Sequence, residues 1–387
     1  MSARFDVAAP SDIRFGAGRV AEAPASLAGL GVRRALVITG ATPGRADALR
    51  TGLQESGIES EVYPVSGEPS VEVVRAGVAA LSSAGCDGVL GYGGGSALDS
   101  AKAIAALAAS GSDPLDHLEM IGVGKPLSRP GLPCVAVPTT AGTGSEVTRN
   151  AVLSAGETKA SLRSPALLPR VAIVDPDLLI GLPPPAIASG GLDALSQVIE
   201  PFLSARANPF TDALAREGIQ RSARSLRRAS EQGMDADSAI RDDLALASLF
   251  GGLCLANSGL GAVHGFAAGL GARLKAPHGA LCGALLPATF QVNYEALRGR
   301  EPNHPALGRM SEVAHMLTGG RTASPESAVE LLVDLKDALR VPGLAHYGIA
   351  ESQIPVLVDA GRKASSMRGN PITLTDEELA SILIRSL

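Results

Sequence analysis

The first half of this 387-residue chain alternates short apolar segments with segments of helical spacing. The apolar segments end at glycine or proline turns and predict strands over residues 34–39, 61–65, 87–91, 134–137 and 171–174. Helical spacing predicts helices over residues 46–56, 71–81 and 97–109. Such alternation is typical of a parallel sheet with helices on both faces. The sequence therefore predicts an α/β architecture for this half.

Two loops rich in glycine and hydroxyl residues follow predicted strands. Residues 92–102 read Y-G-G-G-S-A-L-D-S-A-K, and residues 138–146 read P-T-T-A-G-T-G-S-E. Glycine lets the backbone approach a ligand closely, and free amides at the start of a helix attract phosphate. Because parallel sheets bind ligands beyond the carboxyl ends of their strands, the pair of loops favours a dinucleotide. Neither standard nucleotide motif is met, and for the first loop alone a plain tight turn is the alternative.

The pattern changes after residue 150. Residues 151–154 and 159–162 flank a short A-G-E-T segment and predict a β-hairpin. The three prolines at 183–185 end any regular element, so we predict one domain over 1–181 and another over 182–387. Beyond them apolar residues recur at helical spacing only, which predicts an all-α second domain. Its predicted helices include residues 244–255, 328–339 and 377–384.

Two of the six histidines, His264 and His278, stand fourteen residues apart in a glycine-rich segment, H-G-F-A-A-G-L-G-A-R-L-K-A-P-H-G. Pro277 disfavours one continuous helix, so we place His264 on one helix and His278 in the first turn of the next. Neutral imidazole is the commonest nitrogen ligand for zinc and iron. The pair therefore predicts a metal site, with two unrelated hydrogen-bonded histidines as the alternative.

Asp193 and Gln197 lie four residues apart on the first predicted helix of the second half, so they share one face. Together with the two histidines they would provide four ligands and leave a position for a substrate oxygen. A cation held there would polarise an alcohol or a carbonyl. Glu200 is the other acidic candidate, but it stands beside Pro201, where we expect the helix to end, and we expect it to face solvent.

Composition excludes several other functions. The net charge is −5, aromatic residues make up 3% and tryptophan is absent, which argues against a nucleic-acid surface. We interpret the basic residues of 216–228 as the solvated face of a helix. No apolar run reaches the length of a membrane span and no secretory signal is evident, so we expect a cytoplasmic protein. The dispersed cysteines are interpreted as small buried residues in a reducing compartment: Cys86, Cys134, Cys254 and Cys282.

Taken together, the motifs resemble the iron-containing (group III) alcohol dehydrogenase family, which includes the maleylacetate reductase branch. They follow the family's order over nearly the whole chain: G-G-G-S-A-L-D-S-A-K, P-T-T-A-G-T-G-S-E-V-T, the D-A-L block at 193, and H-G-F with P-H-G. The resemblance implies a dehydroquinate synthase-like fold, with an N-terminal dinucleotide-binding domain, a C-terminal helical metal domain and an active site in the cleft between them. It also implies a homodimer and reversible hydride transfer between NAD or NADP and a small alcohol or aldehyde.

The resemblance also implies a role for individual residues. The cofactor-binding set comprises the end of the first strand, the pyrophosphate turn, the second loop and a lysine near the ribose: Gly40, Gly94, Gly95, Ser96, Asp99, Thr139, Thr140, Thr143 and Lys159. Asn150 falls where the family lines its substrate pocket. Asp193, His264 and His278 match three of the four ligands of the divalent metal, iron or zinc. The fourth is usually histidine and here is Gln197.

The chain departs from the family pattern at three positions. Gln197 offers an amide oxygen, which is a weaker donor for a borderline divalent ion than imidazole. Ala268 replaces a histidine found in many relatives, so a proton would pass through water or the nicotinamide ribose. Gly40 replaces an aspartate that commonly holds the ribose 2′-hydroxyl of NAD, and Arg45 follows it. Without that carboxylate a 2′-phosphate is not repelled, so NADP is as plausible as NAD.

Three alternatives to an alcohol dehydrogenase remain at this stage. A maleylacetate reductase-type enzyme, reducing an oxo-acid, would need cationic anchors, for which Arg149, Arg163 and Arg368 are available. A cyclising lyase of the 3-dehydroquinate synthase type would need several basic residues beside the metal, and none stands near Asp193 or His264 in the sequence. A non-catalytic nucleotide-binding protein with a degenerate metal site would explain Gln197 and Ala268.

Overall fold

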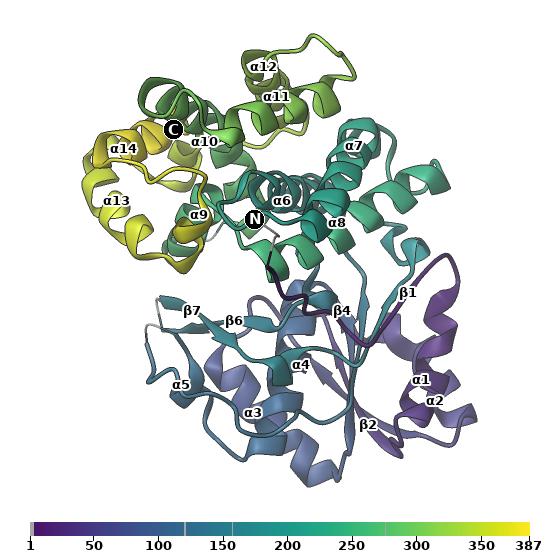
Figure 1. Cartoon of the computed structure of the whole chain (residues 1–387). Coiled ribbons are helices and arrows are strands. Elements are labelled where there is room, and N and C mark those ends of the chain that lie inside the picture. Colours follow the sequence, from purple (N-terminus) through teal and green to yellow (C-terminus); the bar gives the residue numbers. More distant parts are fainter. Residues whose placement is uncertain (1–3, 120, 157, 275) are drawn as a thin grey trace. The chain divides into compact units, whose positions relative to one another are not determined.

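The computed structural model describes residues 4–119, 121–156, 158–274 and 276–387. They form two compact units (Figure 1). The sheet unit comprises residues 8–140 and 144–180. The helical unit comprises residues 141–143 and 181–387, together with the first described residues up to Val7. Three residues of the second glycine-rich loop therefore belong to the helical unit.

Six parallel strands build the sheet unit in the order β1-β8-β5-β4-β2-β3. They are β1 (Asp12–Phe15), β2 (Arg34–Thr39), β3 (Glu59–Pro64), β4 (Gly88–Gly93), β5 (Cys134–Pro138) and β8 (Val171–Val174). β4, β5 and β8 are buried along their whole length, as parallel strands covered on both faces are. The predicted parallel sheet is confirmed. β1 is a sixth strand, which the sequence pattern did not predict.

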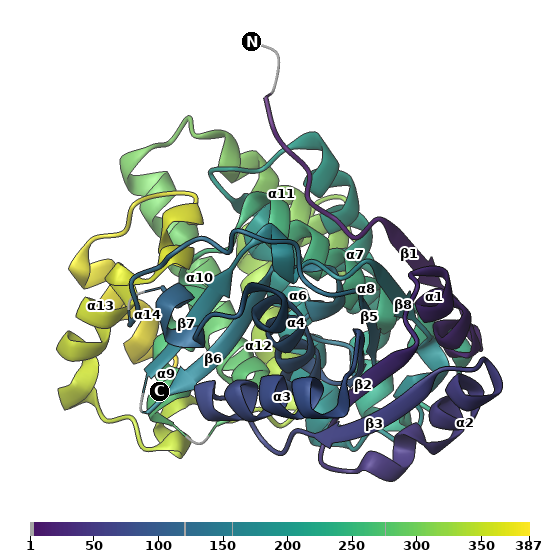
Figure 2. The same ribbon diagram turned by 90° about the horizontal axis from the view of Figure 1, so that it is seen from below.

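Helices cover both faces of this sheet (Figures 1 and 2). α1 (Ala23–Gly29) and α2 (Asp47–Glu55) pack against one set of strand side chains, which includes Val37 and Leu90. α3 (Val71–Ala84) and α4 (Gly95–Ser110) pack against the alternate set, which includes Leu36 and Val89. This alternation follows from the two-residue repeat of a strand. The unit also holds the short helix α5 (Pro114–His117).

The predicted hairpin is also present. β6 (Asn150–Ala155) and β7 (Thr158–Arg163) pair antiparallel outside the main sheet. Its inward-facing residues Leu153 and Leu162 join the apolar core on the α3 and α4 side. The hairpin therefore extends the core of the sheet unit.

The helical unit contains no strand among its described residues, in agreement with the predicted all-α half. Its helices are α6 (Pro184–Leu203), α7 (Pro209–Gln232), α8 (Ser238–Ser258), α9 (Ala262–Arg273), α10 (His278–Arg300), α11 (Pro305–Thr318), α12 (Pro325–Ala338), α13 (Ile354–Lys363) and α14 (Asp376–Arg385). No single described helix has the length and apolar composition to cross a membrane; α8 with residues 262–271 reaches both only across a 101° bend.

Two sequence expectations for this unit need correction. α6 does not end at Pro201 but continues to Leu203, because a proline in the last turn displaces few hydrogen bonds and the residues after it are buried. The basic segment of α7 is largely ion-paired and not simply solvated. Buried Asp243, for example, accepts hydrogen bonds from Arg221 at 2.8 Å and from Arg224 at 2.6 and 2.7 Å. These arginines connect α7 to its neighbours.

Candidate metal centre and cofactor loops

The two histidines occupy separate helices, as the sequence predicted. His264 is the third residue of α9, and His278 is the first residue of α10, directly after Pro277. Close packing of α10 on α6 places His278 near Asp193. A side chain at Gly279 would lie 2.0 Å from the carbonyl oxygen of Ser189, and one at Gly283 would lie 2.5 Å from Leu192. Glycine at these two positions permits the close approach of the helices.

Four potential ligand atoms, from Asp193, His264, His278 and Cys282, lie within 4.8 Å of one another. Asp193 Oδ1 is 3.2 Å from His264 Nε2 and 3.9 Å from His278 Nε2. Cys282 Sγ is 3.8 Å from His264 Nε2 and 3.7 Å from His278 Nε2. Asp193, His264 and Cys282 are buried, and His278 is the half-exposed member. The cluster therefore offers a carboxylate, two imidazoles and a thiol at one point.

Cys282 was missed as a site residue. It is buried, as expected of these cysteines, but it contacts both histidines. The pattern H-x-x-x-C at 278–282 places both side chains on one face of a helix, so this signal was present in the sequence. Spacing between cysteines alone did not reveal it.

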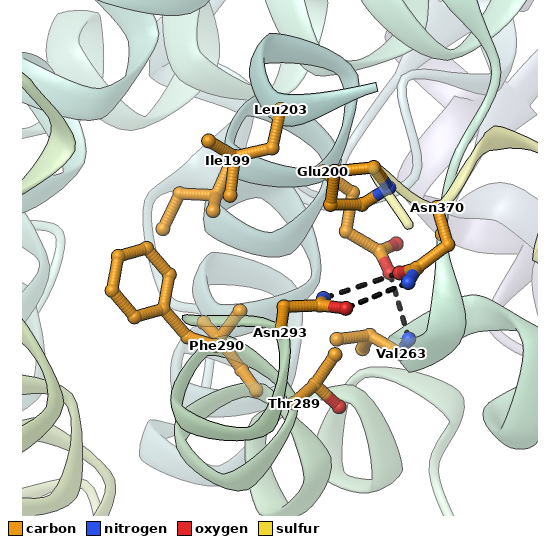
Figure 3. Close-up of a pocket in the computed structure, with 11 residues that line it drawn as sticks. Ile199, Glu200, Leu203, Val263, Thr289, Phe290, Asn293 and Asn370 are labelled. Atoms are coloured by element: carbon orange, nitrogen blue, oxygen red, sulfur yellow. Dashed lines mark hydrogen bonds between the residues drawn. The ribbon is translucent and has the colours of Figure 1, made fainter. Parts of the chain in front are cut away.

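Glu200 does not face solvent, and the expectation that it would is wrong. Its side chain is buried, and its Oε2 accepts a hydrogen bond from His264 Nδ1 at 2.6 Å. Its Oε1 accepts from the backbone amide of Val263 at 2.7 Å (Figure 3). Seven residues are two helical turns, so Glu200 lies on the same face of α6 as Asp193. Donation from Nδ1 fixes the imidazole and leaves Nε2 directed at the cluster, as outer partners of metal-bound histidines do.

The start of α9 is held by a second buried side chain. Asn370 Oδ1 accepts from the amide of Ala262 at 3.2 Å. It also accepts from Asn293 Nδ2 at 3.2 Å (Figure 3). A side chain at Gly261 would lie 2.9 Å from both Asn370 Oδ1 and Glu200 Oε1. Glycine is therefore needed where these two polar groups reach the helix end.

Charges in the cluster shift each other's protonation. Burial alone would lower the pKa of His264, but the charge of Cys282 and the hydrogen bonds with Asp193 and Glu200 raise it well above its usual value. Burial would raise the pKa of Cys282, but the two histidine charges lower it. Burial would also raise the pKa of Asp193, but His264 and His278 lower it. The acidic groups and the histidines of the cluster thus stabilise each other's charged forms.

Gln197 lies one turn from Asp193 and is also buried. Its Nε2 donates to the carbonyl of Gly142 at 3.3 Å, and its amide helps to lower the pKa of Asp193. Its Oε1 is buried and, among the described residues, has no hydrogen-bond partner. Such an atom costs about 1–3 kcal/mol, which a cation would offset. The orphaned oxygen and the mixed oxygen, nitrogen and sulfur donors therefore fit a borderline divalent ion such as zinc or iron.

In the sheet unit, the predicted cofactor residues gather at the carboxyl ends of three adjacent strands. Gly40 follows β2, Gly94 follows β4, and Thr139 and Thr140 follow β5. The amide of Thr139 donates to Gly93 O at 2.9 Å. A side chain at Gly94 would lie 3.2 Å from Thr140 Oγ1. The two glycine-rich loops are therefore in contact, as a shared ligand would require.

Gly95 and Ser96 begin α4, whose first-turn amides are open to an anion. Gly94 caps this helix without a side-chain hydrogen bond, and the first turn holds no acidic residue. Amides at the start of a sixteen-residue helix attract phosphate. The predicted pyrophosphate position therefore fits the local chemistry.

Asp99 has a supporting position instead of an open one. Its carboxylate accepts from Ser145 Oγ at 2.5 Å and from the amide of Val152 at 2.9 Å, and it pairs with Lys102 at 3.0 Å. Lys102 is fully buried and also donates to Thr148 Oγ1 at 2.9 Å. The Asp99–Lys102 pair therefore connects α4 to the second loop and to the hairpin.

The remaining predicted residues are dispersed. Lys159 on β7 forms an ion pair with Glu68. Asn150 begins β6, where its carbonyl accepts from Lys102. Thr143 lies in the three-residue part of the second loop that belongs to the helical unit. Three arginines that could anchor an oxo-acid are exposed: Arg149, Arg163 and Arg368. Arg163 forms an ion pair with Glu119 at 3.1 Å.

The buried carboxyl of Glu146, in the second loop, should make the free energy of unfolding depend on pH. Burial raises the pKa of this carboxyl to about 7, so the folded state keeps a proton that the unfolded chain releases near its ordinary value. Stability contributed by that proton is present at low pH and is lost as pH rises through about 7. We expect Glu146→Gln to stabilise the protein by about 3 kcal/mol at pH 8.5, and hardly at all near pH 4.5.

Urea unfolding at both pH values measures this difference. Glu351→Gln, at an exposed carboxyl, is the matched control and should change neither midpoint. An equal effect of Glu146→Gln at the two pH values would contradict the expected titration.

Comparisons with known proteins bear on both units. Residues 10–176 match the model described as iron-containing alcohol dehydrogenase, and residues 187–387 match the C-terminal model of the Fe-containing alcohol dehydrogenase family. Alcohol dehydrogenase 4 of Schizosaccharomyces pombe is 34% identical, over 96% of this chain and 87% of that protein. 1,3-Propanediol dehydrogenase of Klebsiella pneumoniae is 33% identical, over 98% of this chain and 97% of that protein.

Solved structures show the same similarity. A crystal structure of 1,3-propanediol oxidoreductase has a TM-score of 0.91 and 31% identity, and covers 100% of both chains. Sulfoacetaldehyde reductase from Bifidobacterium kashiwanohense, solved in complex with NAD+, has a TM-score of 0.86 and 29% identity, and covers 99% of this chain and 98% of that one.

Proposed function

The chain belongs to the iron-containing alcohol dehydrogenase family of oxidoreductases, and on this premise we propose that it interconverts a small alcohol and its aldehyde with NAD or NADP. The observation that carries the proposal is the buried cluster of Asp193, His264 and His278, with Glu200 orienting His264. Such a cluster is costly to bury without a positive charge to balance it.

The cluster residues have separate tasks. Asp193 supplies negative charge, and Glu200 holds His264 with its Nε2 facing the other donors. We propose Asp193, His264 and His278 as ligands; Gln197 stands at the position where the family pattern has its fourth. A divalent cation bound there would polarise the substrate oxygen as a Lewis acid. His278, the half-exposed member, marks the side from which a substrate reaches the cluster.

Cofactor binding is assigned to the sheet unit. The open amides of α4 hold the pyrophosphate, and Thr139 and Thr140 provide hydroxyl groups beside it. The complex of sulfoacetaldehyde reductase with NAD+ supports a nicotinamide dinucleotide. Gly40 leaves no carboxylate at the end of β2, and Arg45 nearby is exposed. We therefore propose that NADP is accepted at least as well as NAD.

Proton exchange in this chain takes place without a ring at position 268. Ala268 is exposed on α9 and carries no titratable group. The side chain at position 268 therefore cannot accept the proton of the substrate hydroxyl, which would have to leave through water. Of the three arginines that could anchor an oxo-acid, Arg163 is already paired with Glu119.

A steady-state scan of carbonyl substrates tests the function. Aldehydes of increasing length and two oxo-acids are offered with NADH or NADPH, and nucleotide oxidation is followed by absorbance. We expect turnover with small aldehydes, loss after exhaustive chelation, and recovery with zinc or iron. Turnover with the oxo-acids alone would favour a maleylacetate reductase-type reaction. No absorbance change with any carbonyl would contradict the proposal and favour a nucleotide-binding protein.

A further inference from the structure

Cys282 is a fourth donor in the cluster that the family pattern does not supply. Its thiol lies on α10, one turn after His278, and is fully buried. Each of its two contacts is to the Nε2 of a histidine already proposed as a ligand. Both of these polar contacts of the buried thiol are therefore to atoms that would hold a cation. We propose that Cys282 is a thiolate ligand of the cation and that the site prefers zinc to iron.

The distances support a tetrahedral arrangement of four donors. Zinc binds sulfur at about 2.3 Å and nitrogen or oxygen at about 2.0–2.1 Å, so tetrahedral donors lie roughly 3.3–3.6 Å apart. The four measured separations involving Asp193, His264, His278 and Cys282 are 3.2, 3.9, 3.8 and 3.7 Å. These four of the six donor separations therefore lie close to those of a tetrahedral site, and all six are within 4.8 Å.

Gln197 fits a supporting role in this arrangement. Its Nε2 donates to Gly142 O, and it stands one helical turn after Asp193 on the same face of α6. An amide in this position lies beside the ligands, where outer partners of metal ligands are found. The replacement of histidine by glutamine removes one donor from the family set, and Cys282 provides another from the opposite helix. The two departures together preserve four donors.

The donor type determines which cation is preferred. Thiolate is a soft ligand that favours zinc over harder cations, and mixed sulfur and nitrogen donors in a tetrahedron are typical of zinc. Four protein donors would close a structural site. Here His278 has 36% of its side chain exposed, against 7% for His264 and 3% for Asp193. A substrate oxygen therefore has access on the His278 side as a fifth ligand, which catalytic zinc accepts.

Cobalt(II) substitution reports on the thiolate directly. The metal-free protein is titrated with Co²⁺ under anaerobic conditions, and absorbance is recorded through the near ultraviolet and visible. We expect one Co²⁺ per chain and a thiolate-to-cobalt charge-transfer band in the wild type. Cys282→Ser should lose the band, and its zinc affinity should fall by at least the roughly 10–100-fold that loss of an outer partner costs. The affinity of Cys282→Ser for iron(II) should fall less than its affinity for zinc, so the ratio of the two affinities should decrease.

Matched variants separate Cys282 from the alternatives. Cys254→Ala removes another buried cysteine of the helical unit and should keep the band. Gln197→Ala should also keep it, with a modest loss of affinity. Binding of Co²⁺ by the wild type without a charge-transfer band would overturn the inference, and so would an unchanged band in Cys282→Ser. The wild-type spectrum decides the question even if Cys282→Ser does not fold.

The inference rests on the proposed function, because that function requires a bound cation. Different results would overturn the role of Cys282 and the proposed function. Metal-dependent aldehyde reduction without a thiolate band would leave the function standing and overturn the role of Cys282. A thiolate band in a protein that reduces no carbonyl would support Cys282 as a ligand and overturn the dehydrogenase.

Discussion

Replacement of His264 by alanine is expected to lower kcat/KM for aldehyde reduction about 1,000-fold or more, while NAD(P)H binding changes little. The imidazole of His264 bonds Glu200 through its Nδ1 and faces Asp193 with its Nε2. Its loss removes a ligand and leaves a buried carboxylate without its partner. Polarisation of the substrate oxygen supplies several kcal/mol of transition-state stabilisation, which corresponds to this factor. Steady-state kinetics, metal analysis and the fluorescence of bound nucleotide measure the three quantities separately.

His346→Ala provides the matched control, because this histidine is exposed and contacts only the ring of Tyr347 among aromatic side chains of the described residues. It should keep metal content, turnover and nucleotide binding. Circular dichroism of both variants checks that the helices are retained. Full activity of His264→Ala, with or without metal, would remove the cation from the proposed reaction.

The fold could be predicted from the sequence where burial leaves a clear pattern. β4, β5 and β8 are covered on both faces, so their sequences are almost continuously apolar and are recognised directly. β1 was missed because it lies at the edge of the sheet and is half-buried along its length. Its sequence, D-I-R-F, carries two charges in four residues. Only its pairing with β8 identifies it as a strand.

The candidate site was predictable in part. The spacing of His264, His278 and Asp193 indicated helices that present ligands, and the structure brings these side chains together. The proximity of Glu200 to Pro201 predicts a solvent-facing side chain, but its position two turns after Asp193 predicts the buried face that the structure shows. Cys282 has no cysteine partner in the sequence, and its only signal is the H-x-x-x-C spacing from His278. Both signals concern periodicity, which the sequence contained.

Other features follow only from tertiary packing. The burial of Lys102 and Glu146 depends on how the second loop folds over α4, and no local pattern reports it. Likewise, the assignment of residues 141–143 to the helical unit arises from contacts with distant residues, such as the hydrogen bond from Gly142 to Ser248 Oγ at 2.8 Å. The role of the threonines at 139 and 140 could be predicted from strand ends, whereas the position of Thr143 could not.

Removal of the Glu200 carboxylate is the second change with a large expected effect. Glu200→Ala should weaken cation binding roughly 10–100-fold, because the partner that fixes His264 is lost. It should also lower the free energy of unfolding by about 1–3 kcal/mol, since the buried amide of Val263 loses its acceptor. Glu200→Gln keeps the volume and one acceptor oxygen, so it should recover part of both losses. Zinc titration against a competing chelator and urea unfolding measure the two effects.

A purely structural role of Glu200 is distinguished by the titration of His264. Burial by itself lowers the pKa of His264, and the charge of Cys282 together with the hydrogen bonds to Asp193 and Glu200 holds it high. In metal-free Glu200→Ala that pKa should therefore fall, which proton NMR of the imidazole detects. Asn370→Ala removes the other side-chain acceptor at the start of α9 but does not touch the imidazole, so it should destabilise the protein without moving the pKa. If both variants weaken zinc equally and neither moves the pKa, Glu200 caps the helix and does not position the ligand.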